Sequence, residues 1–174
     1  MDTATDSPAP AGPSDRFDRF DPARKLLSQE EAEARFRGQP GTVFTNGVFD
    51  VLHRGHVAYL AAARALGERL IVAVNSDASA RRLGKGPDRP LNREQDRAFL
   101  LAGLESVDAV VVFEEDTPLA VLARLQPGLY VKGGDYDMAA LAETPLVQGW
   151  GGRSLALPFV DGYSTTALVR RIRG

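Results

Sequence analysis

Five short, mostly apolar runs recur after residue 41, and a segment with helical periodicity follows each of them. The runs lack the regular apolar–polar alternation of a half-exposed sheet, so they predict strands buried on both faces. In the first helical segment, Val57, Leu60, Ala61 and Ala65 share one face. The expected strands are 42–45, 70–74, 107–113, 129–131 and 154–157, and the expected helices are 57–66, 92–103, 117–125, 144–149 and 165–173.

This order of elements predicts an α/β fold with a mostly parallel, five-stranded sheet and helices on both faces. Asn92 and Thr117 are expected to cap the helices that follow them. Ahead of the sheet, Ser28 and Glu31 have the spacing of a capping box, which predicts a helix from Ser28 to about Arg37. The first residues are rich in Ala, Pro and Ser, a composition typical of disorder. The expected organisation is a disordered tail (1–15), a lead-in helical segment (16–41) and one domain (42–174).

Composition narrows the class of protein. With 174 residues the chain has room for one α/β domain, and its formal net charge of −2 gives no electrostatic case for a nucleic-acid or membrane partner. The absence of cysteine excludes disulfides, thiolate metal sites and a thiol nucleophile. No signal peptide and no apolar stretch of membrane-spanning length is found, so the expected location is cytoplasmic.

The first strand runs into a glycine-containing turn and then a helix, at residues 45–56. Such a turn presents unpaired backbone N–H groups and the positive end of a helix dipole, which together bind anions. Gly55 lacks a Cβ, so a phosphate can approach the backbone closely. The chain's two histidines, His53 and His56, both lie in this turn. A single histidine is more often structural, but two around one glycine favour a functional interpretation.

Other polar residues follow later strands, and ligands of open α/β sheets bind beyond the carboxyl ends of the strands. Asn75 and Asp77 follow the second strand, where the alternative is that Ser76 or Asp77 caps a short helix. After the fourth strand, residues 132–135 place a lysine before two glycines and an aspartate. This pattern favours phosphate binding, and the alternative is a plain β-turn.

Two more segments carry candidate phosphate ligands. Residues 81–90 have no periodicity and contain Lys85, which is either a phosphate ligand or part of a solvated basic loop. Ser164, Thr165 and Thr166 open the last helix, and three hydroxyl groups exceed what one N-cap needs. The acidic run at 114–116 is interpreted as a solvated loop, because three consecutive acids cannot all face one point.

Three motifs in this order resemble the cytidylyltransferase-like nucleotidyltransferases: residues 53–56 (His-Arg-Gly-His), residues 132–135 (Lys-Gly-Gly-Asp) and residues 164–166 (Ser-Thr-Thr). The resemblance implies a Rossmann-like sheet that binds a nucleoside triphosphate and transfers its nucleotidyl group to a phosphate. With residues 74–77 and Gly162–Tyr163, the pattern looks similar to the heptose 1-phosphate adenylyltransferases. These make ADP-heptose, a precursor of the lipopolysaccharide core, from ATP and D-glycero-β-D-manno-heptose 1-phosphate.

The resemblance also implies roles for single residues. Mg²⁺ is expected with ATP, and its protein ligand is left unassigned, with Asp50 either binding it or hydrogen-bonding within the turn. The implied catalytic residues are His53, His56 and Lys132. The implied nucleotide-binding residues are Asn46, Gly47, Val48, Phe49, Gly55, Lys85, Ser164, Thr165 and Thr166, and the implied sugar-phosphate-binding residues are Asn75, Asp77, Gly133 and Asp135.

The expected partners are ATP, a sugar 1-phosphate and a separate heptose kinase that supplies it, with a homodimer as a further possibility. Residues 158–161 lack the arginine that glycerol-phosphate and choline-phosphate cytidylyltransferases carry before their Ser-Thr motif, which counts against those activities. Two alternatives stay open. One is a nucleotidyltransferase that uses ATP or CTP and another phosphorylated small molecule, and the other is a nucleotide-binding regulator without turnover.

Overall fold

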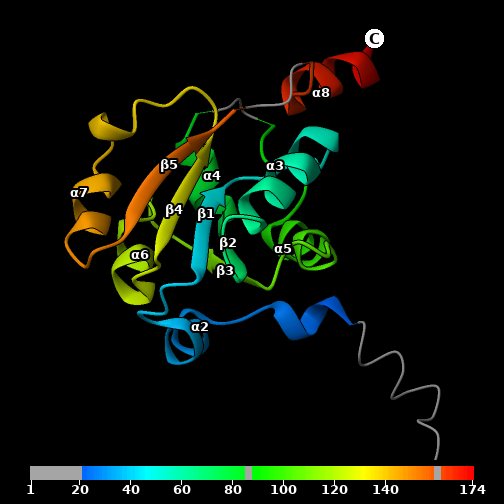
Figure 1. The fold of residues 1–174 in the computed structure, drawn as a ribbon. Coiled ribbons are helices and arrows are strands. Elements are labelled where there is room, and N and C mark those ends of the chain that lie inside the picture. Colours follow the sequence, from blue (N-terminus) through cyan, green and yellow to red (C-terminus); the bar gives the residue numbers. More distant parts are fainter. Residues whose placement is uncertain (1–20, 85–87, 159–161) are drawn as a thin grey trace, which may run out of the picture.

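The computed structural model describes residues 21–84, 88–158 and 162–174. Its centre is a sheet of five parallel strands in the order β3-β2-β1-β4-β5 (Figure 1). The strands are β1 (Thr42–Gly47), β2 (Arg69–Asn75), β3 (Ala109–Phe113), β4 (Leu129–Gly133) and β5 (Arg153–Leu157). The prediction of a parallel, five-stranded Rossmann-like sheet is confirmed. The strand order reverses between β1 and β4, which opens a crevice at their carboxyl ends.

Helices cover both faces of the sheet, as predicted (Figure 1). Helices α3 and α5 pack on one face, and α2, α6 and α7 pack on the other. The helices are α2 (Gln29–Phe36), α3 (Arg54–Arg64), α4 (Asp77–Arg82), α5 (Glu94–Ala102), α6 (Leu119–Leu125), α7 (Glu143–Gln148) and α8 (Thr165–Arg173), with 3-10 turns η1 (Pro22–Lys25) and η2 (Met138–Ala140). None of the described helices is long and apolar enough to cross a membrane.

Neighbouring residues of each strand contribute to opposite cores, which explains why the strands read as continuous apolar runs. Val43 packs beneath α3 and α5, whereas Phe44 packs beneath the helices of the other face. The same division holds for Val72 and Ile71 of β2. Since both faces are covered, every position of a central strand needs an apolar or small side chain.

Local signals placed some helix starts correctly and others wrongly. The capping box is confirmed, because Ser28 Oγ accepts from Glu31 N and Glu31 Oε2 accepts from Ser28 N. The caps at Asn92 and Thr117 were wrong: α5 begins after Arg93 and α6 after Pro118, both without a side-chain cap. Helix α3 also begins earlier than expected, at Arg54 and not at Val57. The predicted disordered tail, residues 1–15, lies outside the described residues.

A close backbone approach joins β4 to the segment before β1 and generates a stability prediction. A Cβ built on Gly128 would lie 1.9 Å from the carbonyl oxygen of Pro40. We therefore expect Gly128→Ala to lower the free energy of unfolding by about 2–3 kcal/mol, because the two backbones must separate. The measurement is urea denaturation followed by circular dichroism.

Gly103→Ala is the matched control for that measurement. A Cβ there would lie 3.4 Å from its nearest atom, and the backbone is already helical, with φ −69°. Its unfolding free energy should stay within about 0.5 kcal/mol of wild type. Equal effects of the two substitutions would contradict the close-approach argument.

Candidate active site

The turn between β1 and α3 holds both histidines in one rigid stack. His53 is the N-cap residue of α3, and its carbonyl oxygen accepts from the backbone of His56 and Val57. The two imidazole rings stack with centroids 3.8 Å apart and planes inclined by 18°. Phe49 meets the His56 ring edge-on at 5.3 Å, and its backbone has a positive φ of 47°. The His56 ring is therefore confined between Phe49 and His53.

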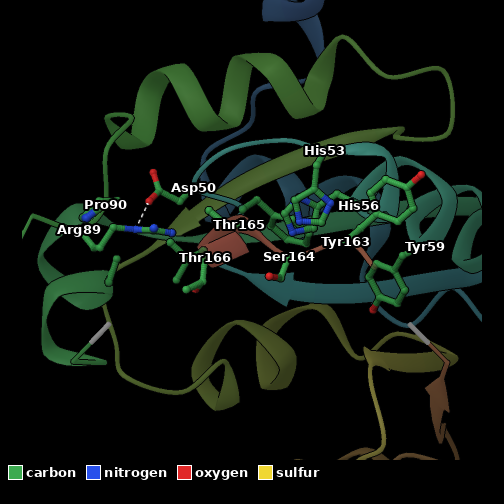
Figure 2. A pocket seen from close by; sticks show the side chains of 14 residues that line it. Asp50, His53, His56, Tyr59, Arg89, Pro90, Tyr163, Ser164, Thr165 and Thr166 are labelled. Atoms are coloured by element: carbon green, nitrogen blue, oxygen red, sulfur yellow. Dashed lines mark ion pairs between the residues drawn. The ribbon is translucent and has the colours of Figure 1, made fainter. Parts of the chain in front are cut away.

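A cavity of about 510 Å³, here called the first cavity, opens over this turn and the start of α8 (Figure 2). Gly55 is necessary for its shape, since a Cβ there would lie 2.9 Å from Tyr163 Cβ and 3.1 Å from the His53 ring. The lining residues are Val48, Phe49, Asp50, His53, Gly55, His56, Tyr59, Ala80, Arg89, Pro90, Tyr163, Ser164, Thr165 and Thr166.

The three hydroxyl residues at the start of α8 divide between capping and the first cavity. Ser164 is the N-cap, and its Oγ accepts from Ala167 N at 3.0 Å. Thr165 Oγ1 makes a long hydrogen bond of 3.4 Å to the carbonyl oxygen of Val51. All three residues, Ser164, Thr165 and Thr166, line the first cavity. The expectation that one N-cap does not use all three hydroxyls agrees with this geometry.

A second cavity, of about 410 Å³, lies at the carboxyl ends of the central strands. It shares Val48, Phe49, His56 and Tyr59 with the first cavity, so His56 lies on a wall common to both. Ligands bound in the two cavities would meet beside His56. The other residues of the second cavity are Asn46, Gly47, Asn75, Leu83, Asp116, Thr117, Pro118, Lys132, Gly133, Tyr136 and Glu143.

A short polar chain lines the second cavity. Asn46 Oδ1 accepts from Tyr130 Oη at 3.0 Å and from Lys132 Nζ at 3.5 Å. The Lys132 ammonium also lies 5.2 Å from the centroid of the Tyr136 ring, within the range of a cation–π contact. Burial, and secondarily the carboxylate of Glu143, raises the pKa of Tyr130, so its hydroxyl stays neutral and donates. Lys132 is thereby held at the end of β4.

Asp50 lies under the turn and supports the segment at residues 89–92. Its side chain is 3% exposed, and its Oδ1 accepts from the backbone of Leu91 at 2.7 Å and of Asn92 at 3.0 Å. Its Oδ2 forms an ion pair with Arg89. These contacts differ from the hydrogen bond within its own turn that the sequence suggested, because the segment that meets Asp50 lies some forty residues later. The suggested role as a Mg²⁺ ligand stays a prediction.

Arg97 is fully buried and joins three segments beneath the site. It donates to the carbonyl oxygens of Val48 (2.6 Å) and Asn92 (3.0 Å), and to the carboxylate of Asp77 (2.7 Å). Asp77, a predicted ligand contact, has its carboxylate paired with Arg97 and lines neither cavity. Ser76 is the N-cap of α4, which was the alternative interpretation.

The structure gathers most of the predicted site residues around the two cavities. Asn46 and Gly47 lie by the second cavity with Lys132, not by the first. Asp135 is exposed and lines neither cavity, and Lys85 lies outside the described residues. The first cavity contains His53, Gly55, Ser164, Thr165 and Thr166; the second contains Asn75 and Gly133; Val48, Phe49 and His56 belong to both.

Sequence reasoning missed several lining residues. Arg89 lies in the basic segment 81–90 and Tyr163 directly before Ser164, so both were in segments already noted, but neither was singled out. Thr117 and Glu143 had no such signal, because only the packing of α6 and α7 against the sheet brings them to the second cavity. Glu143 is buried there with 8% exposure.

The chain was compared with known proteins. Residues 44–171 match the family described as cytidylyltransferase-like. A D-beta-D-heptose 1-phosphate adenylyltransferase of Bordetella bronchiseptica is 60% identical over 152 residues, covering 86% of this chain and 94% of that protein. A protein named bifunctional protein HldE from Trichlorobacter lovleyi is 51% identical over 86% of this chain, and one of the same name from Salmonella arizonae is 54% identical over 84%. This chain spans 30% of the length of each. A solved lipopolysaccharide core biosynthesis protein from Thermoplasma volcanium has a TM-score of 0.58 at 28% identity, covering 71% of this chain and 98% of that one.

Removal of the buried guanidinium tests the support beneath the site. We expect Arg97→Met to lower the free energy of unfolding by about 3 kcal/mol, because three acceptors, one of them the Asp77 carboxylate, lose their donor. Urea denaturation measures this loss. Arg124→Met is the control, since Arg124 pairs with Glu30 and Glu33 at 3.4 Å on the surface, and its loss should stay below about 0.5 kcal/mol. A loss below 1 kcal/mol in the Arg97 variant would contradict the support role.

Burial lowers the pKa of His53 below its ordinary value of 6.5. As the pH falls, His53 is therefore protonated in the unfolded chain before it is protonated in the folded one. The stabilising contribution of neutral His53 is present above pH 6.5 and is lost in acid. Two-dimensional NMR of the imidazole protons should show a midpoint below 6.5, which rises when inorganic triphosphate binds, because an anion favours the charged ring. His56→Asn assigns the signals, since the chain has two histidines. A midpoint that falls or stays constant with triphosphate would argue against an anion beside His53.

Proposed function

The chain belongs to the cytidylyltransferase-like family, and we propose that it transfers the adenylyl group of ATP to D-glycero-β-D-manno-heptose 1-phosphate. The products are ADP-heptose and pyrophosphate, so the enzyme is an adenylyltransferase of lipopolysaccharide core precursor synthesis. The observation that carries this proposal is the 60% identity to a heptose 1-phosphate adenylyltransferase over nearly the whole of that protein.

The two cavities support a division of the substrates. We assign ATP to the first cavity, where the start of α3, His53 and the threonines of α8 offer neutral donors to phosphate oxygens. We assign the sugar phosphate to the second cavity, whose wall contains an amide, a hydroxyl, an ammonium and a carboxylate group. These belong to Asn75, Thr117, Lys132 and Glu143. A wall of this kind suits a phosphorylated polyol, because each sugar hydroxyl needs a donor or an acceptor when it leaves water.

The reaction needs positioning more than acid–base chemistry. A sugar phosphate is largely ionised near neutral pH, since its second pKa is about 6, so it attacks without a general base. A phosphate oxygen of the acceptor forms a bond to the α-phosphorus of ATP, and the bond from that phosphorus to the β-bridging oxygen breaks. Pyrophosphate leaves with the electron pair.

Each proposed catalytic residue has one task in this step. His56, on the common wall, donates to the α-phosphate oxygens as their charge grows. Lys132 holds the acceptor phosphate at the end of β4, and its contact with Asn46 keeps it there. His53 binds the β- and γ-phosphates, as do Thr165 and Thr166. The preorganised stack of the two imidazoles removes the need to reorder these groups during the reaction.

We propose that Mg²⁺ enters with ATP and supplies charge screening of the phosphates. Among the described residues, no group of three or more His, Asp or Glu side chains could hold a metal ion. Asp50, the one carboxylate among the described residues that line the first cavity, already forms an ion pair with Arg89 and accepts from two backbone N–H groups. The residues therefore suit a cation held mainly by phosphate oxygens and water.

A kinase must place the phosphate on C1 of the heptose before this reaction. We propose a separate heptose kinase as its source, in line with the relatives named bifunctional protein HldE, of which this chain matches 30%. The homodimer and the cytoplasmic location stay predictions.

The first test is pyrophosphate release from ATP and Mg²⁺, measured with a coupled assay. We expect release that requires D-glycero-β-D-manno-heptose 1-phosphate, with ADP-heptose identified by mass spectrometry. CTP in place of ATP and glycerol 3-phosphate in place of the sugar phosphate are the controls. Faster turnover with CTP or with glycerol 3-phosphate would overturn the assignment of ATP or of the sugar phosphate, respectively. ATP binding without any turnover would favour a nucleotide-binding regulator.

Replacement of His56 tests its place on the common wall. We expect His56→Ala to lower kcat by ~10²–10³, the usual cost of losing one donor to a developing charge, with a smaller change in KM for ATP. Arg124→Met should leave both constants unchanged, because Arg124 pairs with Glu30 and Glu33 of α2 and lines neither cavity. An unaltered kcat in the His56 variant would refute the assignment.

A further inference from the structure

We propose that Arg89 binds the polyphosphate of the nucleotide in the first cavity, where Asp50 holds its guanidinium in place. The inference rests on the proposed function, which puts a nucleoside triphosphate in this cavity. Of the described residues that line the cavity, Arg89 is the one with a permanent positive charge. The other polar groups there, apart from Asp50, are imidazoles, hydroxyls and backbone N–H groups, which give directed hydrogen bonds but little charge.

The ion pair with Asp50 leaves most of the guanidinium available. Arg89 Nε lies 2.5 Å from Asp50 Oδ2, and the Arg89 side chain is 16% exposed. The structure gives Arg89 no other hydrogen bond or ion pair within the described residues. An arginine has five N–H donors, and four of them belong to the two terminal nitrogens. These four can reach a ligand while Nε stays with the carboxylate.

Asp50 does not cancel the charge that Arg89 offers. Its Oδ1 accepts from the backbone N–H groups of Leu91 and Asn92, which spread part of its negative charge. Figure 2 shows the Arg89 guanidinium between Asp50 and the labelled start of α8. Arg89 lines the same cavity as Thr165 and Thr166. A planar fork in this place suits bidentate binding of a phosphate.

A purely structural role for Arg89 is the alternative, in which it only neutralises Asp50 and fixes residues 89–92. The two roles differ in how they depend on the ligand. Loss of a structural residue would weaken the binding of every ligand of the cavity by a similar factor. Loss of a phosphate ligand would weaken ATP binding strongly and adenosine binding hardly at all.

The experiment is calorimetric titration of the full chain with ATP, AMP and adenosine, each with Mg²⁺. We expect Arg89→Met to weaken ATP binding by about 10- to 100-fold, the usual value of a hydrogen bond to a charged group, and adenosine binding by less than about 2-fold. Arg89→Lys should recover part of the ATP affinity, because it restores the charge without the fork. A similar loss for ATP and adenosine would overturn the proposal.

Two variants keep the test readable if Arg89→Met folds poorly. Asp50→Asn with Arg89→Met removes the unpaired buried carboxylate, and we expect this double variant to be more stable than Arg89→Met and still weak for ATP. Asp50→Asn alone retains the guanidinium and should lose less ATP affinity than Arg89→Met. An Asp50→Asn variant that matches Arg89→Met for all three ligands would establish the structural role instead.

The outcomes separate this inference from the proposed function. Wild-type ATP binding that depends on Arg89, together with no sugar-dependent pyrophosphate release, would uphold the role of Arg89 and refute the heptose reaction. Sugar-dependent pyrophosphate release by an Arg89→Met variant with an unchanged KM for ATP would uphold the heptose reaction and refute the role of Arg89. A wild-type chain that binds no ATP would overturn both.

Discussion

The site depends on one buried guanidinium. Arg97 has no exposure to solvent, and an isolated buried charge of this kind is costly. Its three acceptors come from the β1–α3 turn, the segment before α5 and the first residue of α4. The charge is stabilised only if these three segments take their native positions together. The histidine turn is therefore fixed by an interaction that lies beneath it, outside both cavities.

Asp50 provides a second tie between the same turn and the segment at residues 89–92. Its carboxylate and its carbonyl oxygen both accept from Asn92, and the carboxylate also binds Arg89 and the backbone of Leu91. Because Asn92 also accepts from Arg97, the two ties form one connected polar network. Such a network explains how Phe49 can keep a positive φ next to the His56 ring, since the surroundings over-determine its backbone.

The strand order determines which part of the sheet this network supports. The reversal between β1 and β4 opens the sheet at the carboxyl ends of the two strands that carry the turn and Lys132. A cavity lies on each side of His56, and the two meet at residues that belong to the turn. A transfer between two bound substrates needs such a common wall, because the reacting atoms must approach to contact distance. In the proposed function, the turn under that wall sets where the two substrates meet.

The sequence by itself determined the strands, most of the helices and the turn that holds both histidines, because these depend on short-range patterns. Continuous apolar runs marked the strands buried on both faces, the capping box at Ser28 marked a helix start, and His53, Gly55 and His56 marked the turn. Only the tertiary structure decided the partners of the charged residues. Arg97 meets Val48 across 49 positions, and Asp50 meets Leu91 across 41, so no local pattern reveals that these side chains support the site. Asp77 looks like a ligand contact in sequence, yet in the fold its carboxylate accepts from the buried guanidinium of Arg97. Asn92 looks like a helix cap, yet its side-chain amide donates to the carbonyl oxygen of Asp50, and its backbone N–H donates to the Asp50 carboxylate.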